Sequence, residues 1–497
     1  MRLRQSLLAG LPASVQRPAY DRSAVKAGMA HIGVGAFHRT HQAEYTDDLL
    51  ALRPDSPGLV GINIRPPGLG ETLGQQHGLY TRLIRQGDRI EARVIGSIVK
   101  VVDSQEGAAP ALEVLASPDI DVVTMTVTEK AYCHKPATGK LDRDVPDVIA
   151  DIATPEMPRT LPGLILRTLE LRMQTHGKPV TVISCDNIPG NGLILGNVVR
   201  TMAAERDDKL ARWIERNAAF PSTMVDRIAP ATTQADIDHV EQACGYRDDA
   251  VVVSEAFRQW VIEDNFAGRR PDWDLVGAAF VDDVTPYEHI KMRILNGAQT
   301  ALSYFGVLAG HDYSFEAVGD PLLESFVRRM LVEESVPTLE DVPGMPALPY
   351  VDQSLARLHN TAIRHRCHQI ATDGSQKIVQ RLLNPIRERL RRGQSIDLLA
   401  VPVAAWMAYL VLASERFGGR WKADDPQAGR IASIADRIGD NAEALTSEIL
   451  TTDAIFDPEL AASPTFRTAV AQGLAAMLSN DPMGYLREML KSPGPTS

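Results

Sequence analysis

The stretch Met29-Ala30-His31-Ile32-Gly33-Val34-Gly35 has the pattern of a buried β-strand that runs into a glycine turn. Residues 41–52 follow it with a helical pattern. Gly33 and Gly35 allow a tight turn and a close approach of the backbone to a pyrophosphate, which then lies at the helix N-terminus. His38 occupies the position of the usual third glycine, so a simple strand-to-helix turn also fits this segment.

Strands and helices alternate along the rest of the N-terminal half. Continuous apolar runs at 59–64, 119–127 and 180–185 predict strands of a parallel sheet that is buried on both faces. Helical patterns at 161–176 and 193–206 complete the alternation. This order is typical of an α/β domain.

The alternation stops near residue 285, beyond which the patterns are mainly helical. The predicted helices cover 299–308, 321–334, 353–358, 378–392, 398–415 and 466–477. We therefore predict an α/β fold with a Rossmann-type, dinucleotide-binding domain over residues 1–285. A mainly α-helical domain over residues 286–497 is expected to supply substrate and catalytic groups.

Composition excludes several classes of protein. A chain of 497 residues needs more than one core. A net charge of −11 argues against nucleic acid as a partner, and no run approaches the roughly 20 apolar residues of a membrane span. Pro12 breaks a short apolar run near the N-terminus, which argues against a cleaved signal. These features predict a cytoplasmic protein, monomeric or a small homo-oligomer, that acts on a small molecule.

Cysteine and histidine spacing gives no sign of a metal site. The four cysteines lie far apart and show neither metal-ligand spacing nor a disulfide framework, which fits a reducing cytoplasm. Two histidine pairs at a spacing of three lack the carboxylates or cysteines that accompany zinc. We therefore expect no metal.

The stretch from Pro286 to Gln299 is expected to be a helix with an unusual polar face. At about 100° per residue, Glu288, Lys291, Asn296 and Gln299 fall within an arc of roughly 140°. A lysine among apolar neighbours has its pKa lowered and can exchange protons. Amides beside it can donate hydrogen bonds to an oxygen that gains negative charge. The alternative is an ordinary amphipathic helix.

Polar residues also follow the predicted strands, at the sheet edge where open α/β folds bind ligands. Asn187 in the segment 184–192 is placed to reach a reacting oxygen, although an Asx-type turn explains the segment equally well. Residues 126–130 are expected near the nicotinamide end of a dinucleotide. Arg65 stands where NAD enzymes usually carry an acid, so NADP stays an alternative cofactor.

The residues alone do not assign a functional role to two further segments. Residues 226–230 fit a buried ion pair at a turn, with Asp226 and Arg227 as its charges. Lys377 follows an Asp-Gly turn signal and fits either an exposed charge or a substrate clamp.

Together these segments resemble the long-chain polyol dehydrogenases, the family that includes mannitol 2-dehydrogenase and fructuronate reductase, also called mannonate oxidoreductase. The resemblance runs from about Pro18 to Leu490. It rests on residues 31–42, 126–130, 184–187, 223–228, 257–266, 291–297 and 368–377. His38 in place of the third glycine is itself a habit of that family.

The resemblance implies a zinc-independent dehydrogenase that uses NAD, with NADP as the alternative. It assigns the acid/base to Lys291, the oxyanion-stabilising amides to Asn187 and Asn296, and a proton relay to Glu288. The family usually has Asn-Gly-x-His where this chain has Asn296-Gly297-Ala298-Gln299. Gln299 can exchange hydrogen bonds but cannot carry a proton, which puts the usual substrate in doubt.

The resemblance also implies two sets of binding residues. The cofactor set is Gly33, Gly35, Phe37, His38, Arg39, Arg65, Val127 and Thr128. The substrate set is Asp226, Gln299, Gln369 and Lys377.

Within the family, the segments 257–266, 270–274 and 364–366 are most similar to fructuronate reductases, and mannitol-type enzymes tend to have an arginine at position 369. The expected reaction is therefore the interconversion of fructuronate and mannonate. One alternative is a polyol such as mannitol or arabinitol with its ketose. Another is an inactive dinucleotide-binding sensor, for which Gln299 would be the first sign of decay.

Overall fold

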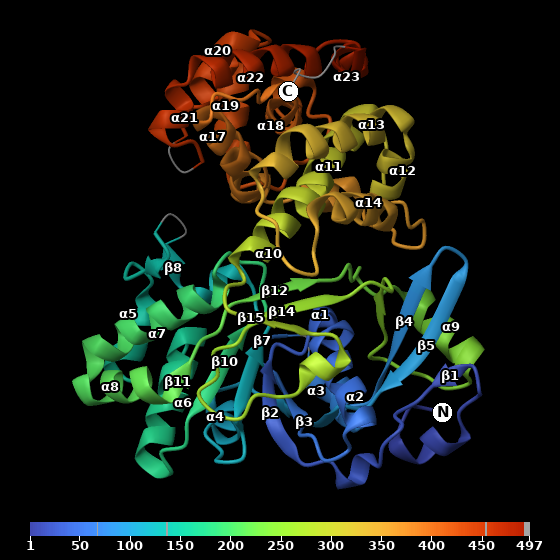
Figure 1. The fold of residues 1–497 in the computed structure, drawn as a ribbon, viewed down its shortest axis with the longest axis vertical. Helices are drawn as coiled ribbons and strands as arrows, with labels where there is room; N and C mark the ends of the chain where they lie inside the picture. Colours follow the sequence, from blue (N-terminus) through green and yellow to red (C-terminus); the bar gives the residue numbers. More distant parts are fainter. Residues whose placement is uncertain (67, 136–137, 453–454, 492–497) are drawn as a thin grey trace. The chain divides into compact units, whose positions relative to one another are not determined.

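The computed structural model describes residues 1–66, 68–135, 138–452 and 455–491 (Figure 1). The chain divides into two compact units, Met1–Thr285 and Pro286–Ser497. The first contains a parallel sheet with helices and the second is mainly helical, which confirms the predicted fold class. Among the described residues, no helix is both long enough and apolar enough to cross a membrane.

The main sheet of the first unit has six parallel strands in the order β11-β10-β7-β2-β3-β6. Its strands are β2 (Ala27–Ile32), β3 (Gly58–Asn63), β6 (Ile98–Asp103), β7 (Val122–Met125), β10 (Val180–Ser184) and β11 (Ala218–Ala219). The strand expected before the glycine turn is confirmed as β2, and the three expected from apolar runs are confirmed as β3, β7 and β10, with somewhat different ends.

Both faces of this sheet are buried, because alternate side chains of one strand point to opposite faces. Val123 and Val182 face a core that includes Ile165 and Val199. The neighbouring strand residues face a second core that contains Trp260. The helices of this unit are α1 (Ala36–Thr40), α2 (Gln42–Leu52), α3 (Leu69–Gln75), α4 (Ala109–Leu115), α5 (Pro146–Ala153), α6 (Leu161–Thr175), α7 (Asn191–Arg206), α8 (Asp208–Asn217) and α9 (Gln234–Cys244).

Three smaller sheets complete the first unit. Their strands are β1 (Val15–Gln16), β5 (Arg89–Ile95), β4 (Tyr80–Gln86) and β13 (Val252–Ser254); β12 (Thr223–Asp226), β14 (Gln259–Glu263) and β15 (Ala279–Val281); and β8 (His134–Lys135) with β9 (Lys140–Leu141). Strands β4 and β5 form a hairpin, and Gly87 in its two-residue turn has a φ of +56°, a conformation that favours glycine.

The second unit is built around α18, which packs on α11 and α22. Its helices are α10 (Thr285–Lys291), α11 (Gly297–Ala309), α12 (Ser314–Gly319), α13 (Pro321–Met330), α14 (Ala347–Leu358), α15 (Cys367–Ala371), α16 (Gly374–Ile378), α17 (Asn384–Arg391), α18 (Asp397–Leu412), α19 (Ala428–Ile438), α20 (Ala442–Ile449), α21 (Pro458–Ala462), α22 (Pro464–Met477) and α23 (Pro482–Lys491). A π turn, Met292–Asn296, separates α10 from α11. The continuous helix predicted there is therefore interrupted between Lys291 and Gly297.

Candidate active site

The glycine turn after β2 has the geometry that its sequence requires. Gly33 has a φ of +90°, and a Cβ there would lie 2.1 Å from the Thr126 carbonyl oxygen, so a side chain cannot be accommodated. Gly35 caps the N-terminus of α1, and a Cβ there would meet no atom closer than 4.0 Å. Gly33 therefore relieves a clash, whereas Gly35 leaves open space beside the backbone.

The side chains of α1 differ in how deeply they lie. His38 is fully buried and stacks on His31, with ring centroids 3.4 Å apart, and burial lowers its pKa well below the ordinary value. Arg39 is buried, donates to the Ala250 carbonyl and lies over the Tyr80 ring. Both ring nitrogens of His38 are buried without a hydrogen-bond partner among the described residues, and the cofactor contacts expected for His38 and Arg39 stay predictions. Phe37 is only half-buried.

The three loops that follow β2, β7 and β10 are hydrogen-bonded to one another. Thr126 donates from Oγ1 to the Gly33 carbonyl at 2.9 Å. The backbone N–H of Val127 donates to the carboxylate of Asp186, at 3.0 and 3.2 Å from its two oxygens. Thr128 is exposed. The predicted cofactor segment at 127–128 is thus fastened to the loop that carries Asn187.

Asn187 is exposed. It lies in the chain between Asp186 and Asn191, which both make several hydrogen bonds. Asp186 also accepts a hydrogen bond from the Tyr132 hydroxyl at 2.6 Å. Asn191 donates to the carbonyls of Asp186 (2.8 Å) and Thr223 (2.9 Å). Both residues belong to the segment singled out from the sequence, but only Asn187 was assigned a role there. Their signal was the run of short polar residues at a strand end, which sequence reasoning interpreted as a turn.

Asp186 gives the folded protein a pH dependence in the acid range. Burial raises the pKa of Asp186 from an ordinary 3.8 to about 6. Because the folded state binds this proton more tightly, the stability contribution is complete below about pH 4 and is lost as the pH rises through 6.

We expect the Asp186→Asn variant not to lose this stability as the pH rises, because asparagine does not titrate. Its free energy of unfolding relative to the parent should therefore rise by up to about 3 kcal/mol between pH 4 and pH 7. Denaturant titrations at pH 4, 5, 6 and 7 measure this difference. A difference that stays constant with pH would show that Asp186 titrates at its ordinary value.

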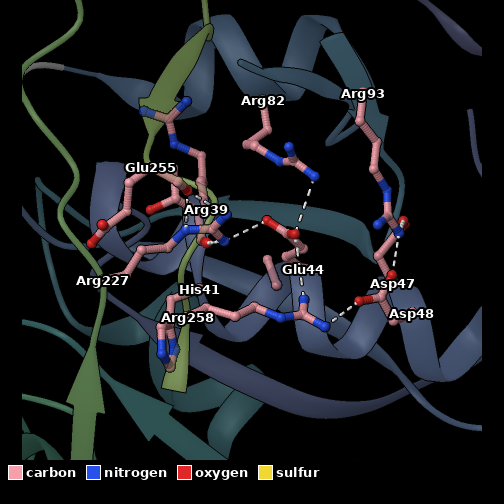
Figure 2. Close-up of polar contacts among 12 residues, drawn as sticks. Arg39, His41, Glu44, Asp47, Asp48, Arg82, Arg93, Arg227, Glu255 and Arg258 are labelled. Carbon is pink, nitrogen blue, oxygen red and sulfur yellow. Dashed lines mark hydrogen bonds and ion pairs between the residues drawn. The ribbon is translucent and has the colours of Figure 1, made fainter. Parts of the chain in front are cut away.

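Asp226 lies at the end of β12 with 2% of its surface exposed. The next residue, Arg227, donates to the carboxylate of Glu44 at 2.7 Å and to the carbonyl of Glu255 at 2.8 and 3.1 Å (Figure 2). The buried ion pair that the sequence suggested for this segment thus joins Arg227 to Glu44 on α2.

Glu44 is the centre of a buried charge cluster (Figure 2). Besides Arg227 it pairs with Arg82 at 3.1 Å and with Arg258 at 3.4 Å. Burial alone would raise the pKa of Glu44, but the charges of these three arginines and of Arg93 outweigh it and lower that pKa to about 2. The cluster joins α2, β4 and the segments that flank β12 and β14, and so fixes the end of the strand that carries Asp226.

In the second unit, Glu288 and Lys291 lie on α10 and Asn296 ends the π turn, and all three are buried. The expected arc of 140° assumed a regular α-helix, in which Lys291 and Asn296 would stand at opposite ends of the arc. A π turn pairs residue i with residue i+5, so positions five apart lie near one face. The π turn therefore brings Asn296 toward the face of Lys291.

The amide of Asn296 is engaged at one end only. Its Nδ2 donates to Oε1 of Gln299 at 3.3 Å. Its Oδ1 is buried and has no hydrogen-bond partner among the described residues. An unsatisfied buried polar atom costs about 1–3 kcal/mol and calls for an explanation, such as a ligand that the site is built to bind.

Gln369 and Lys377 occupy one local structure, α15 and α16, which meet at Asp373 in the left-handed conformation (φ +54°). Nζ of Lys377 donates to the carbonyls of Ile370 and Thr372, so the ammonium lies against the C-terminal end of α15. Gln369 on the same short helix is exposed. Arg65 in the first unit is also exposed, after the end of β3.

Known proteins resemble this chain over most of its length. Two family models match it, the mannitol dehydrogenase Rossmann domain over residues 27–275 and the mannitol dehydrogenase C-terminal domain over residues 283–478. D-mannonate oxidoreductase of Escherichia coli is 39% identical over 434 residues, covering 85% of this chain and 89% of that protein. Mannitol 2-dehydrogenase of Phaeosphaeria nodorum is 36% identical over 428 residues, covering 85% and 75% respectively.

A solved structure is similar along almost the whole chain. The ternary complex of Pseudomonas fluorescens mannitol 2-dehydrogenase with NAD and D-mannitol aligns with a TM-score of 0.89 and 33% identity, covering 99% of this chain and 100% of that one. The resemblance expected from the sequence is confirmed by these matches. The chain therefore belongs to the mannitol dehydrogenase family of oxidoreductases.

Proposed function

We propose that this protein is a zinc-independent, NAD-dependent dehydrogenase that interconverts fructuronate and mannonate. The oxidoreductase class follows from the family. The substrate pair is supported by the 39% identity to a D-mannonate oxidoreductase and by the cations of one segment in the second unit.

Two observations support NAD as the cofactor. The open space beside Gly35 at the start of α1 fits a pyrophosphate, which needs a close approach to the backbone. The related mannitol 2-dehydrogenase was solved with NAD. When bound, the nicotinamide supplies or accepts the hydride.

The proton and the developing charge are handled by side chains of this chain. In reduction, Asn187 and Asn296 donate hydrogen bonds to the ketone oxygen, which stabilises the alkoxide that forms there. Lys291 then protonates that oxygen, and in oxidation it accepts the proton instead. Glu288, one helical turn before Lys291, relays the proton.

The cationic segment from Arg364 to Lys377 is our reason for proposing a sugar acid as the substrate. Arg364 and Arg366 lie over the ring of Tyr313, at 4.5 and 5.5 Å from its centroid. Burial and the charge of Lys377 lower the pKa of His365. A carboxylate gains charge-assisted hydrogen bonds from such groups, whereas a polyol offers no charge to bind.

A substrate panel tests the proposal. The purified protein is assayed with D-mannonate, fructuronate, D-mannitol, D-arabinitol and the corresponding ketoses, by the absorbance of the reduced nicotinamide. We expect kcat/KM for the fructuronate and mannonate pair to exceed that for any polyol by at least about tenfold, as one extra charged contact would give. Preference for a polyol would favour the mannitol or arabinitol alternative. Binding of NAD without turnover of any substrate would favour the inactive sensor.

Cofactor preference is a separate prediction. We expect NAD to be the working cofactor, with weaker discrimination against NADP than an acid after β3 would give, because Arg65 occupies that region. Comparing kcat/KM for the two cofactors with the best substrate checks this. A large preference for NADP would overturn it.

Gln299 is expected to set the substrate ranking. Its Oε1 already holds the amide of Asn296, and a glutamine contributes hydrogen bonds without titrating. A site built around specific hydroxyl contacts rejects analogues that leave a partner unpaired. Gln299→His should therefore change the relative kcat/KM of polyols and aldonates more than it lowers the best rate. An unchanged ranking would make Gln299 a neutral replacement.

A further inference from the structure

Asn191 stands out because it is completely buried and still uses its whole hydrogen-bonding capacity. It is the first residue of α7, four positions after Asn187. Nδ2 donates to the carbonyls of Asp186 and Thr223 at 2.8 and 2.9 Å. Oδ1 accepts from the N–H groups of Thr223 and Gly192 at 2.9 and 2.7 Å. An asparagine amide has two donors and two acceptor sites, so none is left for a ligand.

The partners of Asn191 belong to two functional segments. Asp186 immediately precedes Asn187, the proposed oxyanion amide. Thr223 is the first residue of β12, the strand that ends at Asp226. A single side chain therefore fixes the loop that carries Asn187 to the strand that carries Asp226.

The backbone around Asn191 is packed too closely for this loop to shift easily. A Cβ on Gly192 would lie 2.3 Å from the Pro221 carbonyl oxygen and 2.5 Å from the Ser222 nitrogen. The N–H of Leu193 donates to Oγ of Ser222 at 3.3 Å. The start of α7 thus lies directly against the segment that leads into β12.

We propose that Asn191 is a positioning residue for catalysis, which holds the amide of Asn187 in the place where the substrate oxygen becomes negative. This inference rests on the proposed role of Asn187. Oxyanion donors must be held within about half an ångström of the productive position. A misplacement of about 1 Å, caused by a residue that never touches the substrate, can slow catalysis by about a hundredfold.

Arg172 provides a matched control, because it lies at the amino ends of the strands of the same sheet, whereas Asn191 lies at their carboxyl ends. Arg172 is also fully buried, and it donates to the carbonyls of Ile120 and Pro179, just before β7 and β10, at 3.0 and 2.9 Å. Two more of its hydrogen bonds reach the carbonyls of Leu115 and Ser117. A fifth hydrogen bond reaches the carbonyl of Lys178 at 3.4 Å, so replacing Arg172 removes one more backbone contact than replacing Asn191, at the amino ends of the strands.

The experiment is a double-mutant cycle between Asn187 and Asn191 in the full-length protein. Asn187→Ala, Asn191→Ala, the double variant and Arg172→Leu are compared for kcat, KM, Kd for NAD and Tm, with D-mannonate or the best substrate of the panel. We expect Asn191→Ala to lower kcat by about 10- to 100-fold with Kd for NAD changed less than about threefold. The double variant should be no slower than Asn187→Ala alone, because Asn191 acts through that residue.

Arg172→Leu should lose at least as much Tm and keep kcat within about twofold, which separates positioning from general stability. If Asn191→Ala is too unstable, Asn191→Ser serves in the same cycle, since its neutral hydroxyl introduces no buried charge beside the carbonyls of Asp186 and Thr223. If the fold-losses of kcat caused by the two single substitutions multiply in the double variant, the two asparagines act independently and the inference is overturned. A normal kcat for a folded Asn191 variant would overturn it as well. A normal kcat for Asn187→Ala would instead show that the proposed function of Asn187 is wrong.

Discussion

Lys291→Ala is expected to lower kcat by about two to four orders of magnitude at neutral pH, as the loss of a general acid/base does. Lys291 is 4% exposed at the end of α10, where the helix passes into the π turn. Cofactor affinity should change by less than about twofold, because the expected cofactor residues belong to the other unit of the chain. Steady-state kinetics and a titration of NAD by protein fluorescence measure both quantities.

A melting curve of the Lys291→Ala variant is recorded beside its kinetics, so that a loss of turnover in a folded protein is separated from a loss of the fold. His289→Ala is the matched control, because His289 is exposed on the same helix. It should keep kcat within about twofold. A folded Lys291→Ala protein with near-normal turnover would remove Lys291 from the mechanism.

The elements that the sequence predicted best are those whose local pattern fixes their environment. Strands β7 and β10 could be predicted because each is a short, mainly apolar run rich in β-branched residues, a pattern typical of a strand buried on both faces. The turn at Gly33 was predictable because the residue must adopt a positive φ beside a backbone carbonyl. The family resemblance supplied the site residues that no local pattern distinguishes.

Other features depend on contacts between distant segments and were missed. Strand β4 has an arginine at position 82 that reads as exposed, yet Glu44 of α2 pairs with it in the interior. The π turn at 292–296 has no sequence signal, because its apolar residues fit an α-helix equally well. Asn191 resembled a turn residue, since its role depends on Thr223 thirty-two positions later.

Asn296→Ala is expected to lower kcat by about 10²–10³-fold, the effect of removing one donor from an oxyanion site. The Asn296 amide makes few contacts that stabilise the protein. One end makes a single long hydrogen bond to Gln299, and the Oδ1 atom is buried and unpaired among the described residues. Removing an unsatisfied buried atom offsets the loss of that one bond. Tm should therefore stay within a few degrees of the parent, or rise, while turnover falls.

A variant that keeps its Tm but loses kcat identifies an amide that acts in catalysis. Removing an amide that supports the fold would lower Tm instead. Gln299→Leu is the companion variant, because it removes the partner of Asn296 and leaves the amide itself in place. Its kcat should fall less than that of Asn296→Ala, by about tenfold or less, since Asn296 keeps its donor and loses only its orientation. The measurements are kcat with the best substrate and Tm for both variants. If Asn296→Ala loses several degrees of Tm and little kcat, the amide supports the π turn and the oxyanion role passes to Asn187 alone.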